Sequence, residues 1–358
     1  MAESGPALPL SGIRVLELGT VVAVPYAAML LQCLGAQVTK VEPVGAGDPL
    51  RSHNPLMFDQ LNSGKSIIQC DLKAPQDLDR LRVLVGDVDV MLTSGRTGWL
   101  EPYGLDGKSC AAINPNLVYC ALTGFGSVGP YADDTGFDVT AQAVAGMLTP
   151  ILRTGNPVHG IPAVTDSAAA LATALAAVSG VVGKLSQGRT FTIETSVLEA
   201  AVALSFDGVV LANTEADAGW FDRSRPGTLI FAPTAKDGRR ILLMPAYVTK
   251  FFVGLMEIID RPDLAADPRF SSPEQRMANY DSLREAVDTA FTDKPSGYWR
   301  EALRSKSIPH ALANEWDQVL HDEQVVALEL FGDGRLGADQ LFRGPWRVEG
   351  RRPPREQG

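Results

Sequence analysis

Short β-type runs alternate with apolar helical runs through the first 200 residues of this chain. The run 13–18 predicts a strand, 25–34 a helix with Pro25 in its first turn and Gly35 after its end, and 37–42 a second strand. The alternation continues with expected strands at 66–72, 88–92, 117–122 and 190–194 and expected helices at 75–85, 137–147, 166–185 and 196–213. Strand–helix–strand units need crossover connections, so this pattern predicts an α/β domain with a parallel sheet.

The second half of the chain has a different pattern. Residues 228–233 and 240–244 predict a β-hairpin closed by an Asp237-Gly238 turn, and helices are expected at 247–259, 274–291 and 296–305. A polar, Gly- and Arg-rich stretch precedes the hairpin and is typical of a linker. The sequence therefore predicts a large α/β domain followed by a smaller α+β domain.

Composition limits the classes of function. A net charge of −10 argues against general nucleic-acid binding, although a local basic pocket for a phosphorylated cofactor stays open. The four cysteines are far apart, with no C-x-x-C pair, so we expect buried free thiols, a reducing compartment and no metal site. No stretch reaches about 18 uninterrupted apolar residues and the N-terminus lacks a signal-peptide pattern, so we expect a cytoplasmic protein without a membrane span.

Asp166 is the first candidate for chemistry. It begins the long Ala-rich helical run after a Pro-containing loop, so its carboxylate either caps that helix or projects into a cleft. Arg96 follows the strand 88–92, at the strand end where open α/β sheets bind ligands. The loop 43–65 is rich in Gly, Pro and Asn and carries Asp48, Arg51 and Lys65; it is either functional or a solvated excursion.

Residues 124–129 match the dinucleotide pattern G-x-G-x-x-G directly after a strand. However, Pro130 and a turn-rich segment follow where the pattern requires a helix, and this is not the first strand-to-helix turn of the chain. We therefore reject a nicotinamide-dinucleotide site.

Five separated blocks carry a family resemblance, in order along residues 10–350. They are LSGIRVLELGTVVAVPYAAMLLQCLGAQVTKVEPVGAGDPLR, NSGKSIIQCDLK, NPNLVYCALTGFGSVGPYADDTGFDVTAQAVAG, IPAVTDSAAALATALAAV and QGRTFTIETSVLEA. Together they resemble the class III CoA-transferases of CaiB/BaiF type, which include formyl-CoA and carnitine CoA-transferases and the α-methylacyl-CoA racemases.

The resemblance implies a Rossmann-like large domain, a linker and a small domain, with two subunits interlocked as a homodimer. On this pattern the large domain spans 1–200 and 320–358, the linker 201–225 and the small domain 226–310. Coenzyme A or acyl-CoA is then a substrate, and its 3′-phospho-ADP part lies near the second strand and the following loop. Lys40, Arg51, Lys65 and Arg96 are the candidate phosphate contacts, by charge and by forked hydrogen bonding.

The resemblance also implies a mechanism in which an aspartate, here Asp166, attacks the acyl-CoA thioester to form an aspartyl-acyl anhydride. The CoA thiolate then attacks the aspartyl carbonyl to give an aspartyl-CoA thioester, and the acceptor carboxylate takes over the CoA through a second anhydride. Small-molecule acyl-CoA and carboxylate are the implied partners.

Several positions depart from the family pattern. The racemases use a histidine and a glutamate as acid/base pair, whereas Phe137 and Thr234 or a neighbour stand here, and neither titrates near neutral pH. The glycine usual before the catalytic aspartate is Thr165. In oxalate-using transferases a glutamine holds the acyl group, and Val22 stands at its position here. A tyrosine of those enzymes is likewise replaced by Phe137. Both replacements predict a more apolar acyl pocket.

Asp138 and Gln142 are further candidates for the substrate pocket, and capping of the helix at 137–147 explains Asp138 equally well. Three interpretations stay open. The first is an acyl-CoA:carboxylate CoA-transferase, the second a 2-methylacyl-CoA racemase or isomerase, and the third a catalytically silent CoA-binding subunit of a heteromeric transferase.

Overall fold

The computed structural model describes residues 7–152, 161–212, 229–245, 249–332 and 340–355. The chain divides into two compact units, the large unit Met1–Phe206 with Glu323–Gly358 and the small unit Asp207–Asp322. The expected linker 201–225 begins in helical chain, because α9 (Val197–Leu204) and α10 (Phe206–Ala212) run to residue 212. Its remainder lies outside the described residues.

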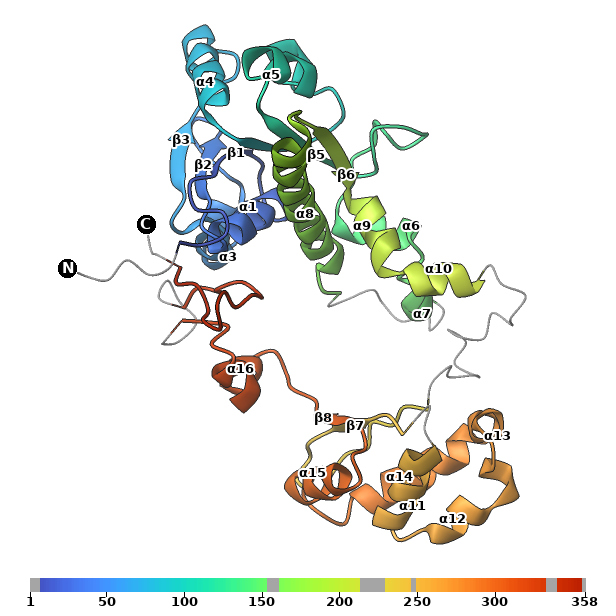
Figure 1. The fold of residues 1–358 in the computed structure, drawn as a ribbon. Helices are drawn as coiled ribbons and strands as arrows, with labels where there is room; N and C mark the ends of the chain where they lie inside the picture. The colour runs from blue at the N-terminus through green and yellow to red at the C-terminus, as the bar shows by residue number, and fades with distance from the viewer. Residues whose placement is uncertain (1–6, 153–160, 213–228, 246–248, 333–339, 356–358) are drawn as a thin grey trace, which may run out of the picture. The chain divides into compact units, whose positions relative to one another are not determined.

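The large unit is built on a six-stranded, fully parallel sheet (Figure 1). Its strand order is β3-β2-β1-β4-β5-β6, which is the Rossmann order and confirms the predicted α/β class. The strands are β1 (Arg14–Leu18), β2 (Gln37–Glu42), β3 (Ser66–Gln69), β4 (Val90–Ser94), β5 (Val118–Thr123) and β6 (Thr192–Ser196).

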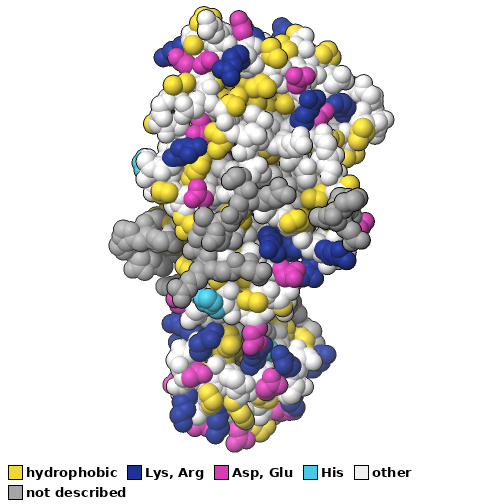
Figure 2. Space-filling model, turned by 90° about the vertical axis from the view of Figure 1, so that its left-hand side faces the viewer, with side chains coloured by type: hydrophobic (Ala, Val, Ile, Leu, Met, Phe, Trp, Pro, Cys, Tyr) yellow, Lys and Arg dark blue, Asp and Glu magenta, His cyan; other side chains and the backbone are white. Residues whose placement is uncertain are grey.

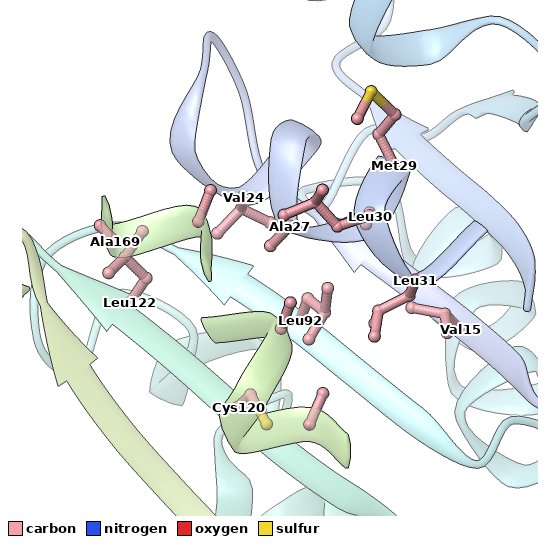
Figure 3. Close-up of a cluster of buried hydrophobic side chains, with 14 of the residues drawn as sticks. Val15, Val24, Ala27, Met29, Leu30, Leu31, Leu92, Cys120, Leu122 and Ala169 are labelled. Carbon is pink, nitrogen blue, oxygen red and sulfur yellow. The ribbon is translucent and has the colours of Figure 1, made fainter. Parts of the chain in front are cut away.

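Helices cover both faces of this sheet. On one face α1 (Ala23–Cys33) and α8 (Val164–Gln187) pack together over alternate strand residues, including Leu92 and Cys120 (Figure 3). On the other face α4 (Pro75–Asp87) and α5 (Gly107–Ile113) cover Met91 and Tyr119. Burial of alternate residues on both faces explains why these strands read as nearly continuous apolar runs.

The segment 43–65 differs from the expected irregular loop. It contains α2 (Leu50–His53) and α3 (Pro55–Asn62). Asn54 caps α3 by accepting a hydrogen bond from the Met57 backbone, and Pro55 occupies its first position. The Gly/Pro/Asn-rich composition favoured a loop, although Asn54 and Pro55 are typical of a helix start and indicate α3.

The chain returns to the large unit at its C-terminal end. Phe342 and Trp346 pack against the core under α1, and the Gln60 side chain exchanges hydrogen bonds with the backbone of Gln340 and Phe342. The remaining elements of this unit are η1 (Glu101–Tyr103), α6 (Asp138–Val144), α7 (Thr149–Leu152) and α16 (Glu323–Ala327).

The small unit is an α+β arrangement, as predicted. Strand β7 (Ile241–Leu243) pairs antiparallel with β8 (His310–Leu312), and bridges between Phe231 and Leu243 and between Thr234 and Arg240 form the expected hairpin. Both charge signs are interspersed on the face seen in Figure 2. The described helices of the small unit are α11 (Thr249–Ile258), α12 (Pro262–Ala266), η3 (Pro268–Phe270), α13 (Pro273–Ala278), α14 (Tyr280–Phe291), α15 (Ser296–Ser305) and η4 (Val319–His321).

Candidate active site

The strand order reverses between β1 and β4, so the loops that follow these two strands lead to opposite sides of the sheet. Open α/β sheets bind ligands in the crevice at this point. A cavity of about 250 Å³, here called the Asp166 cavity, lies there. It is lined by residues 20–24 after β1, 94–96 at the end of β4, 122–124 at the end of β5, the loop residues 132 and 134–137, Asp166 and Val197.

Asp166 lies in the first turn of α8, which begins at Val164. The helix is capped by another carboxylate, because Asp138 Oδ2 accepts hydrogen bonds from the backbone nitrogens of Thr165 and Asp166, both at 2.8 Å. The Thr165 hydroxyl donates to the same oxygen at 2.6 Å. Of the two roles considered for Asp166, the cap therefore belongs to Asp138, and the Asp166 carboxylate is left to line the cavity.

Asp138 is held by its own loop and helix. Gly124 and Gly136 pack so closely that a Cβ added at Gly124 would lie 2.6 Å from the Gly136 Cα, which brings the chain back beside β5 just before α6. Gln142, one turn further along α6, donates to Asp138 Oδ1 and to the Pro162 carbonyl oxygen. Asp138 and Gln142 thus join α6 to the start of α8 and hold in place the helical turn that carries Asp166.

The electrostatic environment raises the pKa of the Asp166 carboxyl to about 6. Burial is the larger cause, since it removes water from the charged form, and the negative charge of Asp138 adds to it. A carboxylate in the first turn of a helix normally gains from the N–H groups there. Here Asp138 has taken those N–H groups, so the Asp166 anion is poorly stabilised and more basic than an ordinary aspartate.

Of the predicted substrate-pocket residues, Val22 and Phe137 line the Asp166 cavity, whereas Asp138 and Gln142 are not among its lining residues. Val22 lines it at the start of α1, and Phe137, 64% exposed, lines it at the start of α6. Arg96 also lines it, and its Nη2 donates to the Thr135 hydroxyl at 2.9 Å. The cavity therefore combines two carboxylates, Asp166 and Asp134, and the Arg96 guanidinium with mostly small and apolar walls.

A second and larger cavity, about 680 Å³, adjoins the first. We call it the β2–β3 cavity because it opens at the carboxyl ends of these strands; it shares Thr20 and Ser94 with the Asp166 cavity. It is lined by residues 18–20, 41–44, 70–73, Ser94 and Trp99. Two adjoining cavities at one edge of the sheet suit an extended ligand whose reactive end reaches Asp166.

Lys40 and Lys65 differ from their expected role as phosphate contacts. Both ammonium groups are fully buried and paired with Glu17, at 2.8 Å for Lys40 and 2.7 Å for Lys65. Lys40 also contacts Asp48 at 3.0 Å and the Gly19 carbonyl oxygen at 2.7 Å. Their donors are occupied by the protein itself, so this placement leaves neither ammonium free for a ligand phosphate.

Arg51 is intermediate between a structural and a binding role. Its guanidinium forms a forked pair with Glu42, at 2.8 and 3.1 Å, and stacks on the Phe58 ring at 4.0 Å from its centroid. The pairing with Glu42 raises the pKa of Arg51 further. Its side chain is nevertheless 41% exposed, so part of the fork still faces solvent.

Sequence reasoning missed Lys73, which lies in the wall of the β2–β3 cavity. The rule that drew attention to Arg96 applied to it as well, because Lys73 follows β3 at the carboxyl edge of the sheet. Sequence reasoning also missed the strained backbone conformation of Val21, whose φ of 66° is rare for a β-branched residue. No pattern in the sequence signals that strain.

Other features of the described ranges bear on earlier expectations. Helix α8 is the one described helix whose length and composition would allow a membrane span, yet it packs on the sheet and on α1 as a core helix. The four cysteines are buried free thiols. Within those ranges no three His, Cys, Asp or Glu side chains group as a metal site would require.

Comparison with known proteins places this geometry in a family. The sequence profile of CoA-transferase family III matches residues 10–354. A probable fatty acyl-CoA transferase of Mycobacterium tuberculosis is 29% identical, covering 95% of this chain and 91% of the relative. A succinyl-CoA–D-citramalate CoA-transferase of Chloroflexus aurantiacus is 30% identical, with 92% and 88% covered.

Solved structures agree with the sequence comparison. The crystal structure of the M. tuberculosis protein superimposes with a TM-score of 0.84 at 29% identity, covering 98% of this chain and 96% of that one. A CaiB/BaiF family protein of Brucella suis shares the fold with a TM-score of 0.82. Since the match extends over nearly the whole chain in sequence and in fold, the chain belongs to CoA-transferase family III and is an enzyme of that class.

Proposed function

We propose that this enzyme transfers CoA between carboxylic acids through covalent intermediates on Asp166. The observation that supports this most strongly is the Asp166 carboxylate itself, which lines the cavity at the point where the strand order reverses, relieved of helix capping by Asp138. Its pKa of about 6 makes it ionised at neutral pH and more nucleophilic than an ordinary carboxylate.

The proposed reaction balances in four steps. An Asp166 oxygen attacks the thioester carbonyl and expels CoA thiolate, forming an acyl-aspartyl anhydride. The thiolate attacks the aspartyl carbonyl and expels the donor carboxylate, leaving an aspartyl-CoA thioester. The acceptor carboxylate then attacks that thioester and expels the thiolate, forming a second anhydride between the acceptor and Asp166. The thiolate finally attacks the acceptor's acyl carbonyl in this anhydride, which forms the new acyl-CoA and regenerates the Asp166 carboxylate.

The tetrahedral intermediates in these steps need hydrogen-bond donors. Helix α1 begins at Ala23, and among the described residues no side-chain cap occupies the backbone N–H groups at this helix start. Ala23, Val24 and the Arg96 guanidinium line the Asp166 cavity. We propose these groups as the source of oxyanion stabilisation.

We propose that the nucleotide part of CoA binds in the β2–β3 cavity, next to Lys73 and within reach of the exposed part of Arg51. This cavity joins the Asp166 cavity at Thr20 and Ser94, which gives the pantetheine arm a path to the nucleophile. Lys73 provides a compact positive charge for phosphate, and Arg51 a fork already half used by Glu42.

The acyl group meets Val22, Phe137 and Val197 in the Asp166 cavity. These apolar walls favour an apolar acyl chain over a small dianion such as oxalate. The M. tuberculosis relative, a probable fatty acyl-CoA transferase, is of the same chemical class. We therefore propose fatty or branched acyl-CoA as donor class.

We also propose that the enzyme works as an interlocked homodimer. On α8, opposite the face buried against the sheet, Leu171, Leu175, Val182 and Leu185 are 47%, 67%, 56% and 80% exposed. Their spacing of 4, 7 and 3 residues forms one apolar stripe along the helix. A second copy of the chain would bury this stripe, and a heteromeric partner would be the alternative occupant.

The experiment is a donor and acceptor panel. Purified enzyme is incubated with fatty, branched and dicarboxylic acyl-CoAs and with free acids, and new acyl-CoA is quantified by mass spectrometry. We expect transfer by the wild type and by Asp133→Asn, an exposed loop aspartate, and at least a 10³-fold loss in Asp166→Asn. Equal transfer by Asp166→Asn would contradict the proposal.

The same samples test the two alternatives. In D₂O, a racemase or isomerase would introduce deuterium at the α-carbon of a 2-methylacyl-CoA without any acceptor acid, and we expect none because Phe137 cannot carry a proton. An inactive chain of native monomeric mass that gains activity only from a partner chain would instead support the silent-subunit interpretation.

A further inference from the structure

The loop between β1 and α1 is strained and lies between the two cavities. Val21 has a φ of 66°, which a β-branched residue adopts only when its surroundings enforce it. Val21 and Val22 line the Asp166 cavity, Gly19 lines the β2–β3 cavity, and Thr20 lines both. A change of this backbone would therefore alter both cavities at once.

Asp48 enforces the conformation. Both of its carboxylate oxygens lie 3.2 Å from the Val21 backbone nitrogen, which donates to them. Asp48 is fully buried, and its own position is fixed by hydrogen bonds from the Leu50 backbone to its carboxylate and from its backbone to Glu42. Lys40 holds the other side of the loop by donating to the Gly19 carbonyl oxygen.

A neutral cluster of four buried charges makes this grip possible. Glu17 pairs with both Lys40 and Lys65, and Lys40 pairs with Asp48, with all four side chains fully buried. Lys65 also donates to the Pro25 carbonyl oxygen in α1, at 2.9 Å. The cluster thus connects β1, β2, the strained loop and the first turn of α1, and each charge has its counterpart.

We propose that Asp48 is a positioning residue for CoA transfer: neutralised by Lys40, it holds the Val21 peptide in its strained conformation and so keeps the walls of the two cavities aligned. This inference rests on the proposed function for its kinetic consequence. Its structural part, the grip of Asp48 on the Val21 amide, is independent of any reaction.

The first test uses the unaltered enzyme and needs no activity. Backbone amide hydrogen exchange, resolved to Val21 by overlapping peptides or by NMR, should show strong protection of this amide despite its place in a loop. Exchange at the rate of an unprotected amide would overturn the proposal whether or not the enzyme transfers CoA.

The second test is rescue of an Asp48 variant by removal of the strain. Asp48→Ala should lower kcat/KM by about 10- to 100-fold. At a positive φ, residues other than glycine incur a conformational penalty that corresponds to a factor of about 5 to 30 in an equilibrium constant. Glycine does not incur this penalty. Adding Val21→Gly should therefore restore about tenfold, whereas adding Val21→Ala, which shortens the side chain but keeps the penalty, should restore nothing.

The outcomes separate a positioning role from a purely stabilising one. If Asp48→Ala lowers the melting temperature but leaves kcat/KM at a permissive temperature unchanged, or if both Val21 substitutions rescue equally, the proposal is wrong. If Asp48→Ala does not fold, Asp48→Asn replaces it. Asparagine puts an NH2 donor in place of one of the two oxygens that accept from the Val21 amide and leaves Lys40 short of a counter-charge, so increased Val21 exchange is the expected result. Unchanged exchange in Asp48→Asn would overturn the proposal as well.

Discussion

Replacing the proposed nucleophile should make the protein more stable. The folded state holds Asp166 with a pKa of about 6 against an ordinary value of 3.8, so folding disfavours its charged form. The full difference corresponds to about 3 kcal/mol above pH 7. Because the side chain is partly exposed, water screens some of this penalty, and we expect Asp166→Asn to raise the free energy of unfolding by about 2 kcal/mol at pH 8.

The sign of the pH dependence follows from the same shift. The folded protein keeps the Asp166 proton to a higher pH than the unfolded chain does. The stabilising contribution is therefore complete below pH 3.8 and is lost as pH rises through about 6. The gain from Asp166→Asn should accordingly fall to about 1 kcal/mol at pH 5 and remain constant above pH 7.

Urea unfolding of wild type and Asp166→Asn at pH 5, 6.5 and 8, at one protein concentration, measures this difference directly. Asp133→Asn is the matched control, since Asp133 is exposed in a nearby loop, and should stay within about 0.5 kcal/mol of wild type at each pH. A variant that is no more stable than wild type at pH 8, or whose gain does not change with pH, would refute the electrostatic account of Asp166.

Three further predictions test other parts of the site. Asp138→Asn retains an oxygen acceptor for the start of α8 but removes the charge beside Asp166, so the acid limb of the kcat/KM–pH profile should move to lower pH; an unmoved limb would show that Asp138 does not raise the pKa of Asp166. Lys73→Met should weaken binding of CoA by about tenfold, measured by calorimetry, and a loss smaller than twofold would remove Lys73 from the proposed phosphate site. Leu175→Glu places a charge in the exposed stripe of α8 and should shift the native mass from dimer to monomer, whereas an unchanged dimer would locate the interface elsewhere.

The architecture was predictable because it follows from local patterns. Alternating strand and helix runs indicated a parallel sheet, and the same pattern located the strand ends near Arg96 and the start of the helix at Asp166. Family resemblance added the chemistry of the lone aspartate. These inferences need only neighbours along the chain and the general rule that ligands bind at strand ends.

The roles of the charged residues could not be predicted, because they depend on partners far apart in sequence. Lys65 lies 48 residues from Glu17, and Asp138 caps a helix that begins 26 residues later. One signal was present: Glu17 and Lys40 are oppositely charged residues inside two adjacent strands, β1 and β2, and they are register partners in the sheet. Two opposite charges in adjacent buried strands indicate an internal pair rather than a ligand site.

Trapping the covalent intermediate tests directly whether Asp166 is the nucleophile. Enzyme is mixed with an acyl-CoA donor without acceptor, quenched with hydroxylamine or borohydride, digested and mapped by mass spectrometry, with Asp166→Asn treated in parallel. If Asp166 is the nucleophile, the wild type alone should carry a hydroxamate or a reduced side chain at Asp166, formed in a CoA-ester-dependent manner. An enzyme that turns over in the transfer assay yet carries no modification at Asp166, or carries it on another residue, would show that Asp166 is not the nucleophile.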